Sequence, residues 1–166
     1  MALKIYFAND LFTEESRLWN QTVVDKIRKK YGNTVDIYLP QENNKINDKK
    51  KYANSIDIAK ADTERLEKAD LLIAVLDGLS IGAGTATEIG IFAEKHKPMI
   101  GVYTDIRQQG ANCQAKLDAL KDVAENQFFY INLFTVGQVK LNGEIVTSSK
   151  QLIKTLGKYV GATHEI

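Results

Sequence analysis

Glu88 is the carboxylate that the pattern of this sequence singles out first. It follows a loop that contains Gly78, Gly82 and Gly84, and it precedes apolar residues at helical spacing. A strand followed by a glycine loop and a helix is the place where open α/β sheets bind ligands. A carboxylate there can act as a nucleophile or as a general acid or base. Glu88 is therefore a candidate catalytic residue.

The spacing around Glu88 also fits a purely structural role. Thr85 and Glu88 match a capping box, in which the acid reaches back to the amide of the cap residue. A carboxylate in a first helical turn also interacts favourably with the helix dipole. As a dinucleotide-binding fingerprint, Gly82 and Gly84 are incomplete, because no third glycine follows three residues later. From spacing alone, capping is the simpler interpretation of Glu88.

Asp62 is a second candidate, because it lies on an apolar helix face. In the helix expected over Ser55–Lys68, it shares that face with Ile58, Ala59 and Leu66. An acid in such a place must be hydrogen-bonded, paired or functional. A structural pair and a functional role both remain open for Asp62.

The elements that must position these carboxylates alternate between strands and helices. The expected strands are Leu3–Ala8, Val35–Leu39, Leu71–Leu76, Met99–Tyr103 and Phe128–Leu133. The expected helices run from a cap at Thr13 to Tyr31, over Ser55–Lys68, from Thr85 to before Pro98, through 115–123, and onward from a cap at Ser148 or Ser149. A hairpin on an Asn142-Gly143 turn is expected over Val139–Val146. The alternation predicts a doubly wound α/β fold of flavodoxin or Rossmann type, with a mostly parallel five-stranded sheet and helices on both faces.

Composition limits the class of protein. The 166 residues predict one domain, 1–166, and the net charge of +1 gives no electrostatic argument for a nucleic-acid polymer or an anionic membrane. Cys113 is the one cysteine, so an internal disulfide is impossible and a reducing cytoplasm is the expected compartment. From its composition, we expect no signal peptide in the first residues and no membrane span. No metal site is expected, because His96 and His164 lack partners at ligand spacing, and no redox cofactor is implied.

With these residues placed, the chain resembles the nucleoside 2-deoxyribosyltransferases over nearly its whole length. The order and spacing of several pieces carry the resemblance together. The pieces are Ile5-Tyr6-Phe7, Leu39-Pro40-Gln41-Glu42, Asp62 eight residues before Asp70, Gly84-Thr85-Ala86-Thr87-Glu88-Ile89-Gly90, Lys97-Pro98 and Asn132-Leu133.

The resemblance implies a set of catalytic roles. Glu88 would attack C1′ of a 2′-deoxynucleoside and form a covalent deoxyribosyl intermediate, which a second base then attacks with net retention. Tyr6 would hold the carboxylate of Glu88, and Asp62 would supply the proton that the leaving base needs. Packing in the sheet is the structural alternative for Tyr6.

The resemblance also implies substrate-binding residues. Asn132 matches an asparagine that enters a neighbouring subunit's site and binds the 5′-hydroxyl, Gln41 or Asn44 matches the region that touches the base, and Phe12 matches an aromatic near the base. The structural alternatives are a turn residue for Asn132 and a hydrophobic staple for Phe12. Gly84 belongs to the motif that contains the nucleophile. Nucleosides and free nucleobases are the expected partners, with a homo-oligomer built from dimers, up to a hexamer.

One position departs from the family pattern. The family usually has an aspartate six residues before the nucleophile, where it helps to hold the substrate, and this chain has Gly82 there. Asp77, on the same loop, is the candidate replacement.

Three functions remain in competition. One is transfer; a second is N-glycosidic hydrolysis, as in the 2′-deoxynucleoside 5′-phosphate N-hydrolases or the cytokinin-activating phosphoribohydrolases; a third is nucleoside or nucleotide sensing without catalysis. The phosphoribohydrolases usually have a Pro-Gly-Gly start where this chain has Ser80-Ile81-Gly82. Phosphate binding favours Arg, Lys, hydroxyls or amide nests, whereas Asn132 suits a neutral hydroxyl, so a nucleoside is favoured over a nucleotide.

Overall fold

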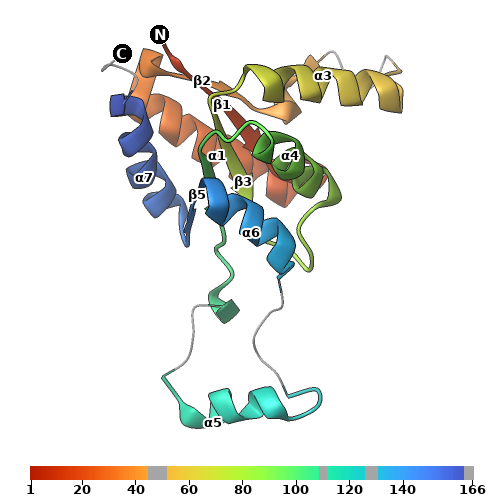
Figure 1. Cartoon of the computed structure of the whole chain (residues 1–166), viewed down its shortest axis with the longest axis vertical. Coiled ribbons are helices and arrows are strands. Elements are labelled where there is room, and N and C mark those ends of the chain that lie inside the picture. The colour runs from red at the N-terminus through yellow and green to blue at the C-terminus, as the bar shows by residue number, and fades with distance from the viewer. Residues whose placement is uncertain (45–51, 109–111, 126–130, 163–166) are drawn as a thin grey trace.

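A parallel sheet of five strands forms the centre of the molecule, in the order β2-β1-β3-β4-β5 (Figure 1). The computed structural model describes residues 1–44, 52–108, 112–125 and 131–162. The strands are β1 Leu3–Ala8, β2 Val35–Tyr38, β3 Leu71–Val75, β4 Met99–Val102 and β5 Gly143–Val146. Strand β3 is buried at every position, as its continuous apolar sequence predicts.

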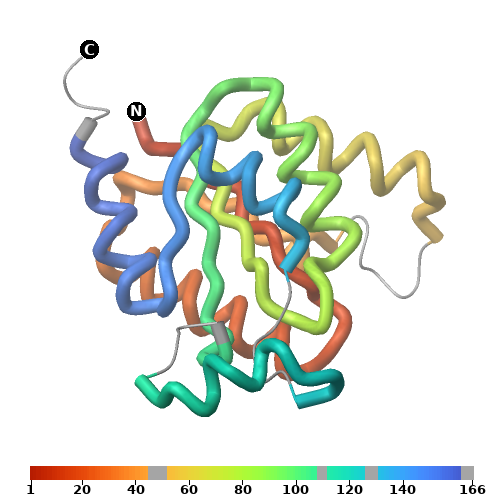
Figure 2. The backbone as a smooth tube through the Cα atoms, turned by 60° about the horizontal axis from the view of Figure 1, so that its bottom comes forward, coloured from red at the N-terminus to blue at the C-terminus, as the bar shows by residue number. Residues whose placement is uncertain are grey.

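Helices cover both faces of this sheet (Figures 1 and 2). One face carries α1 Glu14–Tyr31 and α7 Ser149–Ala162, and the other carries α3 Ser55–Lys68, α4 Ala83–Ala93 and α6 Leu133–Asn142. A separate apolar cluster fills each of the two layers. The predicted doubly wound α/β fold is therefore confirmed. None of the helices in the described ranges is long and apolar enough to span a bilayer.

Short helical segments complete the described chain. They are η1 Gly32–Thr34, η2 Pro40–Glu42, η3 Ile106–Gln108, α5 Gln114–Asp118 and η4 Ala119–Lys121. The single helix expected through 115–123 is thus divided between α5 and η4. Figure 1 shows α5 apart from the sheet and its covering helices.

The caps predicted for two helices are present. The Thr13 hydroxyl accepts a hydrogen bond of 3.1 Å from the Ser16 amide at the start of α1. The Ser148 hydroxyl accepts one of 3.1 Å from the Gln151 amide at the start of α7. Both bonds satisfy amides that have no partner within the helix.

The last strand lies elsewhere than predicted. Leu133 begins α6, so a strand over Phe128–Leu133 is wrong at its described end, and 126–130 lie outside the described residues. The hairpin over Val139–Val146 is also wrong, because Asn142 ends α6 and Gly143 begins β5, which pairs parallel to β4. A Cβ at Gly143 would overlap the carbonyl oxygen of Met99, so this glycine permits close strand approach rather than a turn.

Helix α4 begins earlier than the capping pattern predicts. Its N-cap is Gly82, which makes no side-chain cap bond, and its first turn holds no acidic residue. Glu88 therefore lies in the second turn, and the capping box between Thr85 and Glu88 does not form. The extra turn directs Glu88 away from the helix end and toward β1.

Strand order also determines where a ligand can bind. Strands β2 and β3 lie on opposite sides of β1. Sheets of this kind bind ligands outside the carboxyl ends of the strands where the order reverses. In this chain that crevice lies past Ala8 and Val75, where β1 and β3 end.

Candidate active site

Tyr6 and Glu88 meet in the interior, although 82 residues separate them in sequence. Tyr6 is fully buried on β1, and its hydroxyl donates a hydrogen bond of 2.6 Å to Oε1 of Glu88. Burial, followed by the nearby charge of Glu88, raises the pKa of the Tyr6 phenol and keeps it a proton donor. No described side chain donates to Oε2 of Glu88, so that oxygen remains available to a ligand.

Glu88 has the environment of a reactive carboxylate. Burial raises its pKa from 4.5 to about 7, because the ionised form loses solvation. The hydrogen bond from Tyr6 lowers that pKa, and the charges of Asp62 and Asp10 raise it. A carboxylate with a pKa near the working pH can serve as either a base or a nucleophile.

Asp62 approaches the same site from α3. The Tyr38 hydroxyl lies 3.4 Å from Oδ1 of Asp62, and Asn43 donates to that hydroxyl at 2.9 Å. The pKa of Asp62 is raised, mainly by burial, while the hydroxyl groups of Tyr38 and Tyr6 oppose that shift. A raised pKa suits a group that must give up a proton near neutral pH.

A cavity of about 260 Å³ connects these groups, and we call it the Glu88 cavity. It is lined by Asn9, Asp10, Leu11, Phe12, Pro40, Ile58, Asp62, Gly84, Thr85 and Glu88. Phe12 is 85% exposed, so its ring is free to cover a planar ligand. Nothing lies within 4 Å of the place where a Gly84 Cβ would stand, which leaves the wall open at the first turn of α4.

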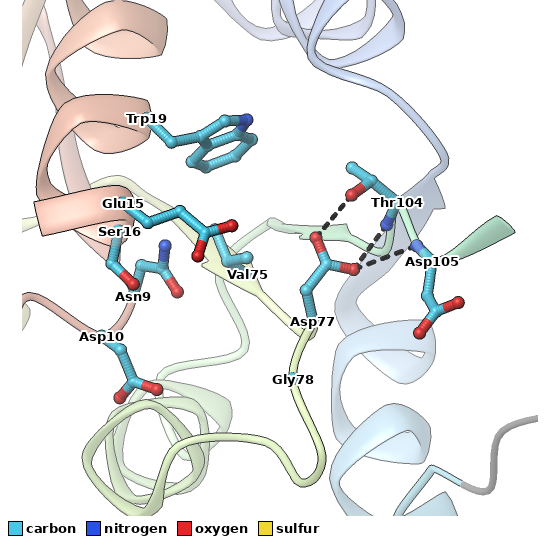
Figure 3. A pocket seen from close by; sticks show the side chains of 10 residues that line it. All are labelled: Asn9, Asp10, Glu15, Ser16, Trp19, Val75, Asp77, Gly78, Thr104 and Asp105. Atoms are coloured by element: carbon cyan, nitrogen blue, oxygen red, sulfur yellow. Dashed lines mark hydrogen bonds between the residues drawn. The ribbon is translucent and has the colours of Figure 1, made fainter. Parts of the chain in front are cut away.

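A second cavity of about 420 Å³ adjoins the first, and we call it the Asp77 cavity (Figure 3). It shares Asn9 and Asp10 with the Glu88 cavity and is otherwise lined by Glu15, Ser16, Trp19, Val75, Asp77, Gly78, Thr104 and Asp105. Asp77 accepts bonds from the Thr104 amide at 2.6 Å, the Thr104 hydroxyl at 2.7 Å and the Asp105 amide at 3.3 Å. Its two oxygens thus hold the loop after β4, and Asp77 is not among the residues that line the Glu88 cavity.

Asn132 is placed at a helix start, away from the two cavities. It is the N-cap of α6, and its Oδ1 accepts from the Thr135 amide at 3.0 Å and the Thr135 hydroxyl at 3.2 Å. The side chain is exposed, and it lines neither the Glu88 cavity nor the Asp77 cavity. The substrate-binding role of Asn132 and the neighbouring subunit that it would require both stay predictions.

The two amides predicted to touch the base also lie outside the lining of the Glu88 cavity. Gln41 donates to the Arg17 carbonyl oxygen at 3.0 Å and accepts from the Asn20 amide at 3.1 Å. Asn44 is exposed beside 45–51, which lie outside the described residues. Contact of either amide with a base stays a prediction.

Asp10 is a further candidate site residue, and the sequence alone did not point to it. It lines both cavities, and its charge contributes to the raised pKa of Glu88. Only its place directly after the first expected strand could have indicated it. The described residues contain no group of three or more His, Cys, Asp or Glu that could hold a metal ion.

A match to a protein family covers the residues of this site. The model of the nucleoside 2-deoxyribosyltransferase family matches residues 5–144, which include both Tyr6 and Glu88. The chain belongs to the nucleoside 2-deoxyribosyltransferase family. The predicted resemblance is thereby confirmed.

Solved structures show how widely this fold of the deoxyribosyltransferase family is shared. A conserved protein from Enterococcus faecalis V583 is 50% identical, with a TM-score of 0.89, over 96% of this chain and 99% of that one. A 2-desoxiribosyltransferase from Leishmania mexicana is 19% identical, with a TM-score of 0.55, over 80% of this chain and 85% of that one. A CMP N-glycosidase from Clostridium botulinum is 15% identical, with a TM-score of 0.51, over 94% of this chain and 98% of that one. A search of curated proteins gave no significant match.

Proposed function

We propose that this protein is an enzyme that transfers 2-deoxyribose between nucleobases through a covalent deoxyribosyl-Glu88 intermediate. The observation that supports it best is the buried Glu88 carboxylate, which Tyr6 holds at 2.6 Å beside a cavity that contains Phe12 and Asp62. Membership of the family adds to this support. The expected setting is nucleoside salvage in the cytoplasm, by a protein folded as one domain.

Each group has one task in the proposed reaction. Glu88 attacks C1′ through its free oxygen, and the bond from C1′ to the base nitrogen breaks as the ester bond forms. The electron pair of the broken bond leaves with the base, which receives a proton from Asp62. A second base then attacks C1′, its displaced proton returns to Asp62, and Glu88 leaves as the carboxylate. Two inversions give net retention.

Charge favours a nucleoside over a nucleotide as the substrate. The Asp77 cavity, which adjoins the Glu88 cavity, is lined by Asp10, Glu15, Asp77 and Asp105, and no Lys or Arg is among its described lining residues. A phosphate placed there would meet the negative charges of Asp10, Glu15 and Asp77, while Arg107 beside the cavity is already ion-paired with Asp105. This lining disfavours cleavage of a nucleotide such as the CMP named for the Clostridium botulinum glycosidase.

We also propose that the active form is a homo-oligomer. Beside Asn132, α6 exposes Leu133, Phe134 and Leu141, which are 77–79% accessible to solvent. Exposed apolar residues in contiguous groups mark protein interfaces. A second copy bound there would bring the free amide of Asn132 toward the 5′-hydroxyl in its neighbour's cavity. Light scattering should give a multiple of the monomer mass, and full activity in a monomer would contradict this proposal.

One incubation separates the three functions. The protein is mixed with deoxyinosine and adenine, and the products are separated by chromatography. Transfer gives deoxyadenosine and hypoxanthine, hydrolysis gives free deoxyribose, and a sensing domain gives neither. The proposal predicts deoxyadenosine as the main product, and deoxyribose as the main product would contradict it.

A further inference from the structure

At the start of α4, the carboxylate of Asp10 lies where any side chain at position 82 would have to begin. A Cβ at Gly82 would overlap Oδ1 of Asp10 and lie only 3.0 Å from its Cγ. The backbone at Gly82 has φ −51° and ψ 135°, which any L-amino acid adopts. Space for the Asp10 carboxylate, rather than backbone freedom, is therefore what the glycine provides.

The loop that carries Asp10 is anchored from the other side. Asn20, which is 1% exposed on α1, donates to the backbone oxygen of Asp10 at 3.0 Å and accepts from the Asn9 amide at 2.7 Å. The carboxylate of Asp10 itself receives no side-chain or backbone donor from the described residues. A fixed backbone thus presents an unpaired acceptor to the wall shared by the two cavities.

We propose that the carboxylate of Asp10 accepts a hydrogen bond from a sugar hydroxyl of the bound nucleoside and thereby selects a free hydroxyl over a phosphate. This inference rests on the proposed function. The carboxylate of Asp10 lies next to position 82, where the family pattern has an aspartate. Asp10 itself belongs to the loop that follows β1. Asp10 therefore replaces a side chain that α4 lacks, and Asp77, which the Thr104 loop engages, does not.

The first test removes the charge of Asp10 and the hydroxyls of the substrate in turn. Asp10→Asn should lower kcat/KM for deoxyinosine roughly tenfold to a hundredfold, the usual effect of losing a charge-assisted hydrogen bond. The same substitution should change little for whichever analogue, 2′,3′-dideoxyinosine or 2′,5′-dideoxyinosine, lacks the hydroxyl that Asp10 binds. An equal loss with all three nucleosides, or no loss, would overturn the proposal. Asp36→Asn, an exposed acid on β2 outside both cavities, is the matched control.

The second test moves the carboxylate between the two positions. Gly82→Ala should displace Asp10 and reproduce the effect of Asp10→Asn while the melting temperature changes little. Asp10→Gly combined with Gly82→Asp should recover at least about tenfold in kcat/KM over Asp10→Gly alone, since the carboxylate returns from the other side. If kcat/KM of the double variant did not exceed that of Asp10→Gly, the proposal that a carboxylate at either position serves the same role would be contradicted.

Binding separates this inference from the proposed function. Calorimetric titration of the same three nucleosides into the Glu88→Gln variant needs no turnover. The comparison is between Glu88→Gln alone and Glu88→Gln combined with Asp10→Asn. If the wild-type protein transfers no deoxyribose but the added Asp10→Asn still weakens deoxyinosine binding selectively, only the proposed reaction fails. If transfer occurs and Asp10→Asn leaves the affinity for deoxyinosine unchanged, only this inference fails.

Discussion

The two cavities at the carboxyl edge of the sheet use their carboxylates in opposite ways. Asp77 accepts three hydrogen bonds from the loop after β4, so its oxygens are engaged in holding structure. Glu88 is buried with one donor, Tyr6, and its pKa is raised to about 7. The difference indicates that burial and the number of hydrogen-bond donors, rather than residue type or proximity to the crevice, distinguish the structural acid Asp77 from the proposed nucleophile Glu88.

Removal of Glu88 should give the largest effect. We expect Glu88→Ala to lower the rate of deoxyribosyl transfer by at least about a thousandfold while the protein remains folded, since the substitution removes the proposed nucleophile. Glu94→Ala, an exposed glutamate at the C-terminal end of the same helix, should retain wild-type rates. Initial rates with deoxyinosine and adenine give the comparison. A Glu88→Ala variant that melts at a lower temperature yet turns over normally would make Glu88 as structural as Asp77.

The sugar should give the second largest effect. We expect kcat/KM for deoxyinosine to exceed that for inosine by roughly tenfold to a hundredfold, because an unpaired 2′-hydroxyl crowded against Glu88 and Tyr6 costs about 1–3 kcal/mol. The hydroxyl also withdraws electrons from the cation-like transition state. Both substrates are measured with the same acceptor base. Equal values would indicate an enzyme that handles ribosides.

The hydrogen bond from Tyr6 should set the pH dependence. Because Glu88 must be ionised to attack, kcat/KM should rise as the pH passes through about 7. Tyr6→Phe removes the bond that lowers the pKa of Glu88, so the midpoint should move to higher pH, with a loss of roughly tenfold below it that narrows above it. Tyr31→Phe, whose hydroxyl contacts the Ile153 carbonyl oxygen on the other face, is the control. If the pH midpoint of kcat/KM were the same in Tyr6→Phe and the wild type, Tyr6 would not control the ionisation of Glu88.

Stability should respond to the two acids with opposite signs. The pKa of Glu88 is higher in the folded protein than its model value of 4.5, so the free energy of unfolding falls as the pH rises from 4.5 through about 7. Glu88→Gln should therefore stabilise the protein by roughly 1–3 kcal/mol at about pH 8, and by little at the acid end of that range. Asp77→Asn should destabilise it by about 1–3 kcal/mol, since donors of the Thr104 loop lose charged acceptors. Urea denaturation at about pH 8 and about pH 4.5 measures the change in the free energy of unfolding for each variant. Changes of the same sign for Glu88→Gln and Asp77→Asn at about pH 8 would contradict this contrast between the two acids.

Local patterns were sufficient for most of the sheet. The continuous apolar run of β3 before Asp77 and the apolar residues of β1, which Lys4 alone interrupts, are long enough for a strand and too short for a helix, so both strands follow from sequence. Toward the end of the chain the prediction is wrong, because Asn142-Gly143 is a common hairpin turn. In the structure, Val136 and Val139 are buried at helical spacing in α6. Position 143 must be glycine because a Cβ there would overlap the carbonyl oxygen of Met99. Tertiary packing therefore overrode turn propensity there.

The site was less predictable than the fold. Spacing alone favoured capping for Glu88, and only the resemblance brought Tyr6 to it across 82 residues. Gly82 is the N-cap of α4, and a Cβ at that position would overlap the carboxylate of Asp10, which lies in a different loop. A contact between two loops leaves no periodic signal in either, so the sequence points to Asp77, on the same loop, as the replacement for the family aspartate and gives no indication of Asp10.

A mass spectrum of the enzyme during turnover tests the central claim most directly. The protein is mixed with deoxyinosine without an acceptor base, quenched in acid, digested and analysed. The account predicts an added mass of one deoxyribosyl group on the peptide that contains Glu88, which adenine discharges as deoxyadenosine and which is absent from Glu88→Ala. Turnover with an unmodified Glu88, or with the sugar attached to another residue, would contradict it.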